Sequence, residues 1–121
     1  MPAVRALRGA TTVDADTPEQ LHERVQALLQ RMLDRNDVDK DDCISILFTA
    51  TDDIHSMFPA AAAREIGFGD VPLICARELE IDGGTPMCVR IMMHINTDKA
   101  RNELHHVYLE GARGLRDDLP E

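Results

Sequence analysis

The sequence is poor in aromatic residues and has no long apolar run. Its 121 residues include no Trp, one Tyr and three Phe. Proteins that bind single-stranded nucleic acid stack the bases on aromatic side chains, so this class of partner is not expected. No apolar run approaches the roughly 18 residues of a membrane-spanning helix, and no charged-then-apolar leader is present. These absences predict a cytoplasmic protein that does not insert into a membrane.

Positive charge is also scarce. The chain has 13 Lys and Arg residues against 22 Asp and Glu residues, a formal net charge of -9. Nucleic acids and anionic membranes both require a basic surface, so neither is expected as a partner. An anionic ligand would have to bind against the electrostatic repulsion of this net negative charge. Its site must therefore gather the few arginines that the chain has.

Patterns that would indicate a metal or a covalent nucleophile are missing. The three cysteines, Cys43, Cys75 and Cys88, show no CxxC spacing and are expected to be reduced thiols, each a small core residue. The five histidines have neither the spacing nor the neighbouring cysteines of a zinc site. No P-loop, GxSxG or GxGxxG motif occurs. The residues therefore indicate neither a zinc site nor a phosphate- or dinucleotide-binding loop.

What the chain does have is the composition of one globular domain over residues 1–121, with 44% apolar residues. The order β-α-β-α-β-β predicts an α+β fold on a mixed sheet. The last two long strands are expected to pair as a hairpin through Asp82–Thr85, and residues 114–121 are expected to form a mobile tail. The predicted elements are a strand from Val4 that ends in a turn by Thr12, a helix from Thr17 to about Asn36, a strand over Cys43–Thr51, an alanine-rich helix over Phe58–Ile66, strands over Val71–Ile81 and Met87–Ile95, and a helical turn or two within Glu103–Arg113.

Two arginines occupy informative positions. Arg8 stands before Gly9 at the end of the first strand, where it is either a solvated side chain or a clamp for a carboxylate. Arg90 lies in the middle of an apolar strand, and a buried arginine without an anion costs several kcal/mol. Glu78 or Glu80 could supply that anion in a structural salt bridge.

Together with other polar groups, these arginines form a set suited to binding a small polyanion and stabilising charge. Such a set favours a reaction that needs orientation and an electrostatically complementary transition state rather than covalent catalysis. The set comprises Arg8, Arg64, Arg90, Arg116, Glu78, Tyr108 and Cys75.

Five motifs in collinear order resemble the monofunctional, Bacillus-type chorismate mutases. The motifs are RGATTV from Arg8, ATxDxHxxFPAxAxRE over Ala50–Glu65, VPxxCxxE over Val71–Glu78, GGxxxCxRxMM over Gly83–Met93 and HVYLEGAxxLRxDL over His106–Leu119. The resemblance implies a homotrimer of α+β subunits forming a pseudo α/β-barrel, with active sites between neighbours. It implies the [3,3] rearrangement of the dianion chorismate to prephenate, on the route to phenylalanine and tyrosine, without cofactor or metal.

The resemblance also implies roles for individual residues. Arg90 would donate to the ether oxygen of the breaking bond, Arg8 would bind a carboxylate, and Glu78 would accept from the ring hydroxyl and stabilise positive charge on the ring. The remaining residues would bind the substrate or close the site. They are Tyr108 as a donor to a carboxylate, Cys75 as a polar wall, Phe58 as an apolar wall, Ile74 beside them, Arg64 and Arg116 at the mouth, and Leu115 packing over the site.

Two departures from the family pattern and one conflict of strand parity raise questions. The family pattern has a lysine where this chain has Ala61 and a threonine where it has Ile74, so one rim cation and one hydroxyl are lost. In addition, Cys75 and Glu78 have opposite parity in a strand, so regular alternation cannot place both side chains in one pocket. Either a bulge lies between them or the cleft wraps around the strand end, and we expect an irregularity within Ala76–Leu79.

Three other classes of function remain as alternatives. A non-catalytic trimeric protein could use the same cleft to bind a small carboxylate, but it would gain nothing from Glu78 beside its anionic ligand. A small trimeric deaminase of similar fold would use an arginine in a different motif, which is not found here. A purely structural protein would leave the arginine cluster without a role.

Overall fold

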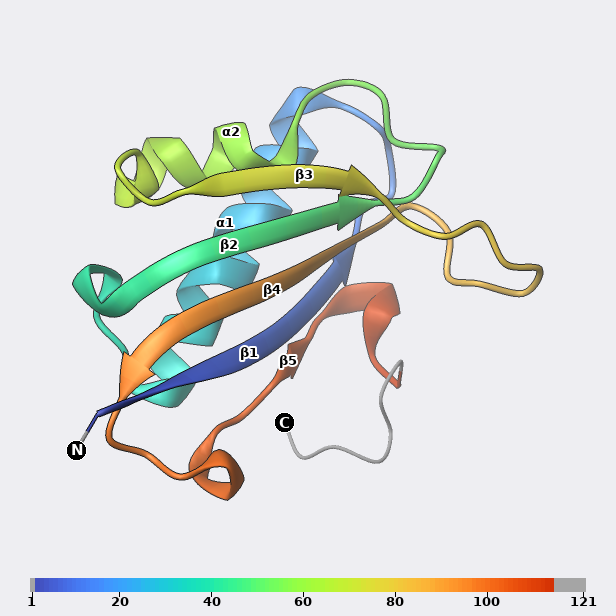
Figure 1. The fold of residues 1–121 in the computed structure, drawn as a ribbon. Helices are drawn as coiled ribbons and strands as arrows, with labels where there is room; N and C mark the ends of the chain where they lie inside the picture. Colours follow the sequence, from blue (N-terminus) through green and yellow to red (C-terminus); the bar gives the residue numbers. More distant parts are fainter. Residues whose placement is uncertain (1, 115–121) are drawn as a thin grey trace.

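Five strands form one mixed sheet, with both helices packed on the same face (Figure 1). The computed structural model describes residues 2–114. The strands are β1 (Ala3–Thr12), β2 (Cys43–Ala50), β3 (Leu73–Arg77), β4 (Cys88–Thr97) and β5 (Val107–Tyr108). Their order is β3-β2-β4-β1-β5, with β4 antiparallel to both of its neighbours and the two outer pairs parallel. The predicted α+β class and mixed sheet are confirmed.

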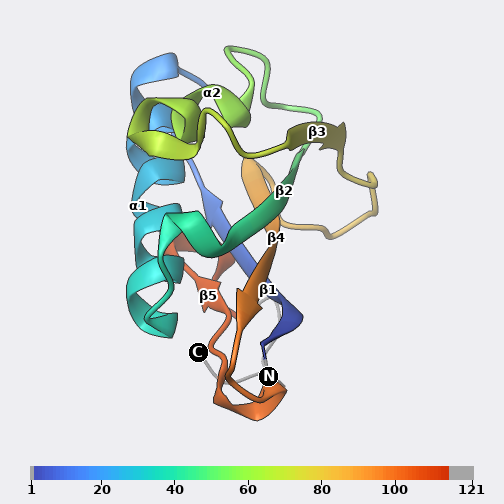
Figure 2. The same cartoon turned by 60° about the vertical axis from the view of Figure 1, so that its left-hand side comes forward.

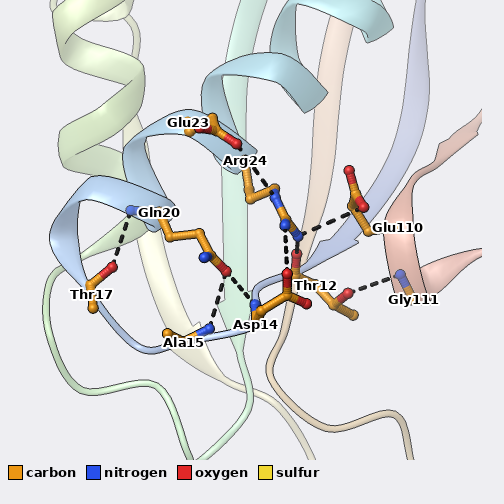
Figure 3. A network of polar contacts seen from close by, with 9 residues as sticks. All are labelled: Thr12, Asp14, Ala15, Thr17, Gln20, Glu23, Arg24, Glu110 and Gly111. Carbon is orange, nitrogen blue, oxygen red and sulfur yellow. Dashed lines mark hydrogen bonds and ion pairs between the residues drawn. The ribbon is translucent and has the colours of Figure 1, made fainter.

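Helix α1 (Pro18–Asn36) starts where its sequence signals place it. The Thr17 side chain accepts a hydrogen bond from the Gln20 backbone N–H at 3.2 Å, and Pro18 occupies the first turn (Figure 3). The Gln20 side chain reaches back to the Asp14 and Ala15 backbone N–H groups rather than to Thr17. One stripe of the helix is buried, and it comprises Leu21, Val25, Leu28, Leu29, Met32, Leu33 and Asn36.

The close packing of α1 on β1 depends on Gly9. A Cβ atom at this position would lie 2.6 Å from Met32 Sδ and 3.2 Å from Leu28 Cδ1, closer than side chains can pack. The missing side chain therefore lets the helix approach the strand directly.

Helix α2 (Pro59–Ala63) is short and continues into a wider turn, η2 (Arg64–Phe68). Gly67, with φ of +102°, breaks the helical conformation inside that turn. Ala60, Ala62 and Ala63 are buried, because small side chains let α2 pack closely on the rest of the helical layer.

No helix within residues 2–114 covers the opposite face of the sheet, and we call it the open face (Figures 1 and 2). Alternation in the strands gives the helical face Leu7, Phe48 and Ile91, each at most 2% exposed. The open face carries Val4, Leu47 and Ile74, which are 59%, 37% and 64% exposed. Within residues 2–114 no helix is both long and apolar enough to span a membrane.

The first strand is longer than predicted. β1 continues through Thr12 and pairs with β4 along its whole length, so no turn begins there. Thr11 and Thr12 are 0% and 8% exposed. The expectation that they lie beyond the strand end was wrong, because their β-branched side chains suit a strand as well as a turn.

The predicted hairpin between the third and fourth long strands is also wrong. β2 lies between β3 and β4 in the sheet and pairs with both. The turn signal is real, since the Gly84 N–H donates to the Ile81 carbonyl at 2.9 Å. That turn sits inside a longer loop because β3 already ends at Arg77.

The segment Glu103–Arg113 is mostly extended rather than helical. Val107 and Tyr108 form β5, which pairs parallel to β1, between the two short 3₁₀ turns η3 (Arg101–Glu103) and η4 (Glu110–Ala112). Leu104, Val107 and Tyr108 are buried as expected. The predicted mobile tail, with Leu115 and Arg116, lies outside the described residues apart from residue 114.

Candidate active site

A row of side chains crosses the open face of the sheet at one level. Arg90 on β4 lies opposite Thr49 on β2 and opposite Ala10 on β1, and Ala10 lies opposite Tyr108 on β5. Residues directly opposite each other in a sheet share a face. The register therefore brings Arg90 and Tyr108 to the two sides of one small residue.

Arg90 has an anionic partner in the same row. Its Nε lies 3.4 Å from Glu78 Oε2, and the Thr49 hydroxyl donates to the same oxygen at 2.6 Å. The Glu78 backbone N–H donates to the Ala50 carbonyl at 2.9 Å, which continues the β2–β3 pairing by one residue. Of the two carboxylates that the sequence left open, Glu78 is the partner of Arg90.

Two polar atoms of this row are buried without a hydrogen-bond partner among the described residues, namely Arg90 Nε and the Tyr108 hydroxyl. The Arg90–Glu78 contact is thus an ion pair without an aligned N–H···O bond at Nε. Tyr108 is 5% exposed and packs in a small cluster with Ala10, Cys88 and Ala112. Buried polar groups are normally paired, so two unpaired donors at one level of the sheet indicate a place for a ligand.

Arg8 belongs to the same face. It lies two residues before Ala10 on β1 and opposite Met92 on β4. Its backbone N–H donates to His106 Nδ1 at 2.9 Å, which ties β1 to the segment leading into β5. The structure therefore brings Arg8, Glu78, Arg90 and Tyr108 onto one face.

A second group of predicted site residues lies around the outer strand β3. Cys75, Phe58 and Ala61 line one cavity of about 610 Å³. Cys75 lies opposite Phe48 and so faces the helical layer, while Phe58 is 73% exposed. Arg64 is exposed at the end of α2, and Ile74 is exposed on the open face.

The structure does not bring Cys75 and Glu78 together within one chain. The β2–β3 ladder is regular from Leu73 to Arg77, so the predicted irregularity does not interrupt the strand. The strand ends at Arg77, and Glu78 reaches Thr49 on the open face, whereas Cys75 faces the helical layer. Side chains therefore alternate regularly to the end of the strand, and Cys75 and Glu78 belong to different surfaces of the subunit.

Two of the thiols have raised pKa values, Cys88 beside Arg90 and Cys43 at the start of β2, far from the row. Burial raises the pKa of the Cys88 thiol, although the neighbouring Arg90 acts in the opposite direction. Burial also raises the pKa of Cys43 to about 11. Within residues 2–114 no group of three or more His, Cys, Asp or Glu side chains is arranged to hold a metal ion.

Sequence reasoning missed residues that hold the row in place. Thr49 donates a hydrogen bond to Glu78, and it lies opposite Arg90 because β2 pairs with β4. The sequence predicted a different partner for β4, so this contact was not expected. Asp53 accepts hydrogen bonds from the Met87 N–H at 3.0 and 3.2 Å, and this holds the φ of +51° at Met87 just before β4. Thr49 lies just outside the quoted motifs, and Asp53 lies within ATxDxHxxFPAxAxRE, but nothing in that motif indicates a contact with Met87.

The match to known proteins covers nearly the whole chain. Residues 4–119 match the family model for chorismate mutase type I. The chain belongs to the type I chorismate mutase family. The motif resemblance and the expectation of an enzyme of this kind are thereby confirmed.

Individual members of the chorismate mutase family are similar over the same extent. Chorismate mutase AroH of Bacillus subtilis is 40% identical over 96% of this chain and 92% of its own length. Chorismate mutase AroH of Thermus thermophilus is 44% identical over 96% of both chains. The structure of a chorismate mutase from Clostridium thermocellum superposes with a TM-score of 0.88 at 44% identity, over 90% of this chain and 97% of the other.

Proposed function

We propose that this chain rearranges chorismate to prephenate, by electrostatic stabilisation and without a covalent intermediate. One observation carries the proposal beyond family membership. Arg90 Nε and the Tyr108 hydroxyl are buried donors without a hydrogen-bond partner in residues 2–114, they flank Ala10, and the Glu78 carboxylate lies 3.4 Å from Arg90 Nε. A dianionic substrate would supply the missing acceptors.

In the proposed mechanism Arg90 carries the main catalytic role. As the ether C–O bond breaks, negative charge develops on the oxygen, and a fixed guanidinium stabilises it without reorganisation. The ion pair with Glu78 and the strand on each side hold Arg90 in place before substrate binds. Arg8 and Tyr108 would bind substrate carboxylates and so orient the two reacting ends.

Glu78 would stabilise the positive charge that develops on the ring of the substrate. Its carboxylate, held by the Thr49 hydroxyl, would accept a hydrogen bond from the ring hydroxyl and stabilise the positive charge developing on the ring. A carboxylate beside an anionic ligand weakens plain binding but stabilises a transition state whose two fragments carry opposite charge. This supports a catalyst over a carboxylate-binding protein.

We also propose that the chain acts as a homotrimer with active sites between subunits. The open face carries exposed apolar side chains at Val4, Leu47 and Ile74, as a surface that packs on another copy would. The site residues of one chain fall into two separate groups, so a neighbour would have to add Cys75 and Phe58 to the row containing Arg90.

The remaining assignments complete the proposal. Arg64 and Arg116 would attract the dianion at the mouth, Leu115 would pack over it, and Ile74 would line the pocket. Ala61 leaves one rim cation absent, which is expected to weaken substrate capture more than chemistry. We treat residues 1–121 as one domain, and we propose a cytoplasmic enzyme because the three thiols are unpaired.

The direct test is the loss of chorismate absorbance with the purified protein and with Arg90→Ala. We expect rapid conversion to prephenate by the native protein and a loss in kcat corresponding to about 3–4 kcal/mol for the variant. Arg101→Ala, which removes a charge from an exposed turn, is the matched control and should retain full activity.

Thermal unfolding of each protein separates catalysis from folding. A folded native protein that leaves chorismate intact but binds it would favour the carboxylate-binding alternative. Equal rates for the native protein and a folded Arg90→Ala variant would mean that Arg90 only completes a structural salt bridge with Glu78.

A further inference from the structure

Tyr108 lies on the shortest strand of the sheet. β5 consists of Val107 and Tyr108 alone and pairs only with β1, supported by a hydrogen bond of 2.9 Å from the Leu109 N–H to the Ala10 carbonyl. So short a ladder gives few constraints on the placement of the tyrosine ring. Contacts outside the sheet must therefore fix the position of Tyr108.

One constraint comes from the turn that directly follows β5. In η4, Ala112 is fully buried in the cluster that contains Tyr108. The Gly111 N–H donates to the Thr12 hydroxyl at 2.9 Å, and a Cβ at Gly111 would lie 2.8 Å from that oxygen. The turn is thus pressed against the end of β1, and moving it would move the wall of the Tyr108 pocket.

Arg24 on α1 connects this turn to the end of β1 (Figure 3). Its Nη1 donates to the Thr12 carbonyl at 2.6 Å and lies 3.8 Å from Glu110 Oε1, and its Nη2 donates to Asp14 Oδ2 at 3.0 Å. Only 14% of the Arg24 side chain is exposed, although the sequence places it on the charged face of the helix. The Arg24 guanidinium thus contacts three parts of the chain, namely β1, the β1–α1 connection and η4.

The other end of the same segment is also held by α1. Asn36, fully buried at the end of the helix, accepts from the His105 N–H at 2.6 Å and donates to the His105 carbonyl at 2.8 Å. The segment from His105 to Glu110 therefore runs between two anchors on a helix that carries no predicted site residue. Arg24 supplies the anchor on the side of Tyr108.

We propose that Arg24 is a positioning residue that holds the Tyr108 ring and hydroxyl in the row with Arg90. It acts through η4 and Thr12 and contacts no substrate. A planar fork with several donors suits this task, because one group must satisfy a carbonyl and three carboxylates, those of Asp14, Glu23 and Glu110, in different directions. The role of Arg24 in placing Tyr108 is inferred from the structure alone, whereas the effect of Arg24 on catalysis rests on the function proposed above.

The sequence offers a direct probe of this placement. Tyr108 is the single tyrosine of the chain and there is no tryptophan, so tyrosine fluorescence and its near-ultraviolet circular dichroism report on this ring alone. In Arg24→Ala we expect the dichroism band to lose most of its amplitude and acrylamide quenching to increase. Arg24→Lys should keep part of both signals. Arg31→Ala removes a charge from an exposed position of the same helix and should match the native protein.

A double-mutant cycle tests the link to catalysis. We expect Arg24→Ala to lower kcat/KM for chorismate on the order of 10-fold or more in the native background. In a Tyr108→Phe background the same substitution should cost much less, because the group that it positions is already absent. Its effect on thermal stability should be equal in both backgrounds.

The outcomes separate this inference from the proposed function. Native fluorescence and dichroism in a folded Arg24→Ala variant would overturn the positioning role, whatever the activity. Additive losses of kcat/KM in the cycle would overturn its link to Tyr108. Absence of turnover in the native protein would refute the proposed function, while the spectroscopic result would still decide whether Arg24 places the ring.

Discussion

Tyr108 carries a buried hydroxyl without a hydrogen-bond partner in residues 2–114, an arrangement that costs free energy in the unliganded protein. Tyr108→Phe is therefore expected to leave the melting temperature unchanged or to raise it. Substrate binding should weaken, with KM rising about 10-fold, because a hydrogen bond to a carboxylate contributes roughly 1.5–3 kcal/mol. Thermal unfolding and steady-state kinetics on the same preparations measure the two effects.

A lower melting temperature together with an unchanged KM would contradict this assignment. In that case the hydroxyl would be a structural group. Phe48→Tyr is not a useful control because that side chain is fully buried in the main core. Arg31→Ala, on the exposed surface of α1, controls for handling and expression.

Cys75 provides a second test at the residue scale, by alkylation. It is half-buried and lines the cavity with Phe58, whereas burial raises the pKa of both Cys43 and Cys88. Iodoacetamide at pH 8 is therefore expected to modify Cys75 first, because the thiolate is the reactive form. Saturating prephenate should protect Cys75, as peptide mass spectrometry can measure. Modification at the same rate with and without prephenate would place Cys75 outside the substrate site.

At the scale of elements, the connection before α2 depends on Asp16. Its carboxylate accepts from the His55 N–H at 2.8 Å and from the Ser56 N–H at 3.0 Å, which holds the loop that presents Phe58. Hydrogen bonds from Ser56, and then from His55, lower the pKa of the Asp16 carboxyl below its ordinary value of 3.8. A depressed pKa stabilises the folded state above the unfolded-state pKa, and this contribution is lost as the pH falls through the folded-state value.

The expected result is a pH-dependent difference between the native protein and Asp16→Asn. At pH 6 the variant should have a lower free energy of unfolding. The difference should shrink as the pH falls from about 3.8 through the lower folded-state pKa, because the Asp16 carboxyl then becomes protonated in the folded protein as well. Urea unfolding from pH 3 to pH 6 measures it. A difference that stays constant over this range would show that the charge of Asp16 is not involved.

Element prediction from the sequence succeeded where the signals were local. The start of α1 follows from Thr17 and Pro18, and its buried stripe from the spacing of leucines. The wrong hairpin and the missed strand β5 share a different cause, because partner choice depends on residues distant in the chain. Nothing near Val107 reveals that Gly9 is its neighbour, and nothing near Cys88 reveals that β2 separates β4 from β3.

At the scale of the whole molecule, the open face predicts association. Leu47→Asp would place a charge on the exposed apolar centre of this face, 37% exposed in the isolated chain, and is expected to dissociate the proposed trimer and abolish activity. Leu79→Asp is the matched control, since Leu79 is 78% exposed on the loop after β3. Sedimentation velocity measures assembly. A trimeric, fully active Leu47→Asp protein would exclude the open face as the interface.

The candidate site could be predicted only in part, for a reason that belongs to this scale. Motif resemblance identified Arg8, Glu78, Arg90 and Tyr108, and the register then placed all four on one face. The relation of Cys75 to Glu78 could not be worked out within a single strand, because alternation separates them. No irregularity within Ala76–Leu79 is needed if, as proposed, different subunits supply Cys75 and Glu78 to one site.

The separation of the two groups has a genetic consequence. In a cyclic trimer each site would take one group from one chain and the second from its neighbour. A chain with Arg90→Ala and a chain defective at Phe58 or Cys75 would each be inactive alone, yet every mixed trimer would contain one site with both groups intact. Coexpression of two null alleles should thus restore roughly a quarter of the sites by random assortment. Intragenic complementation would then arise from the geometry of a single sheet.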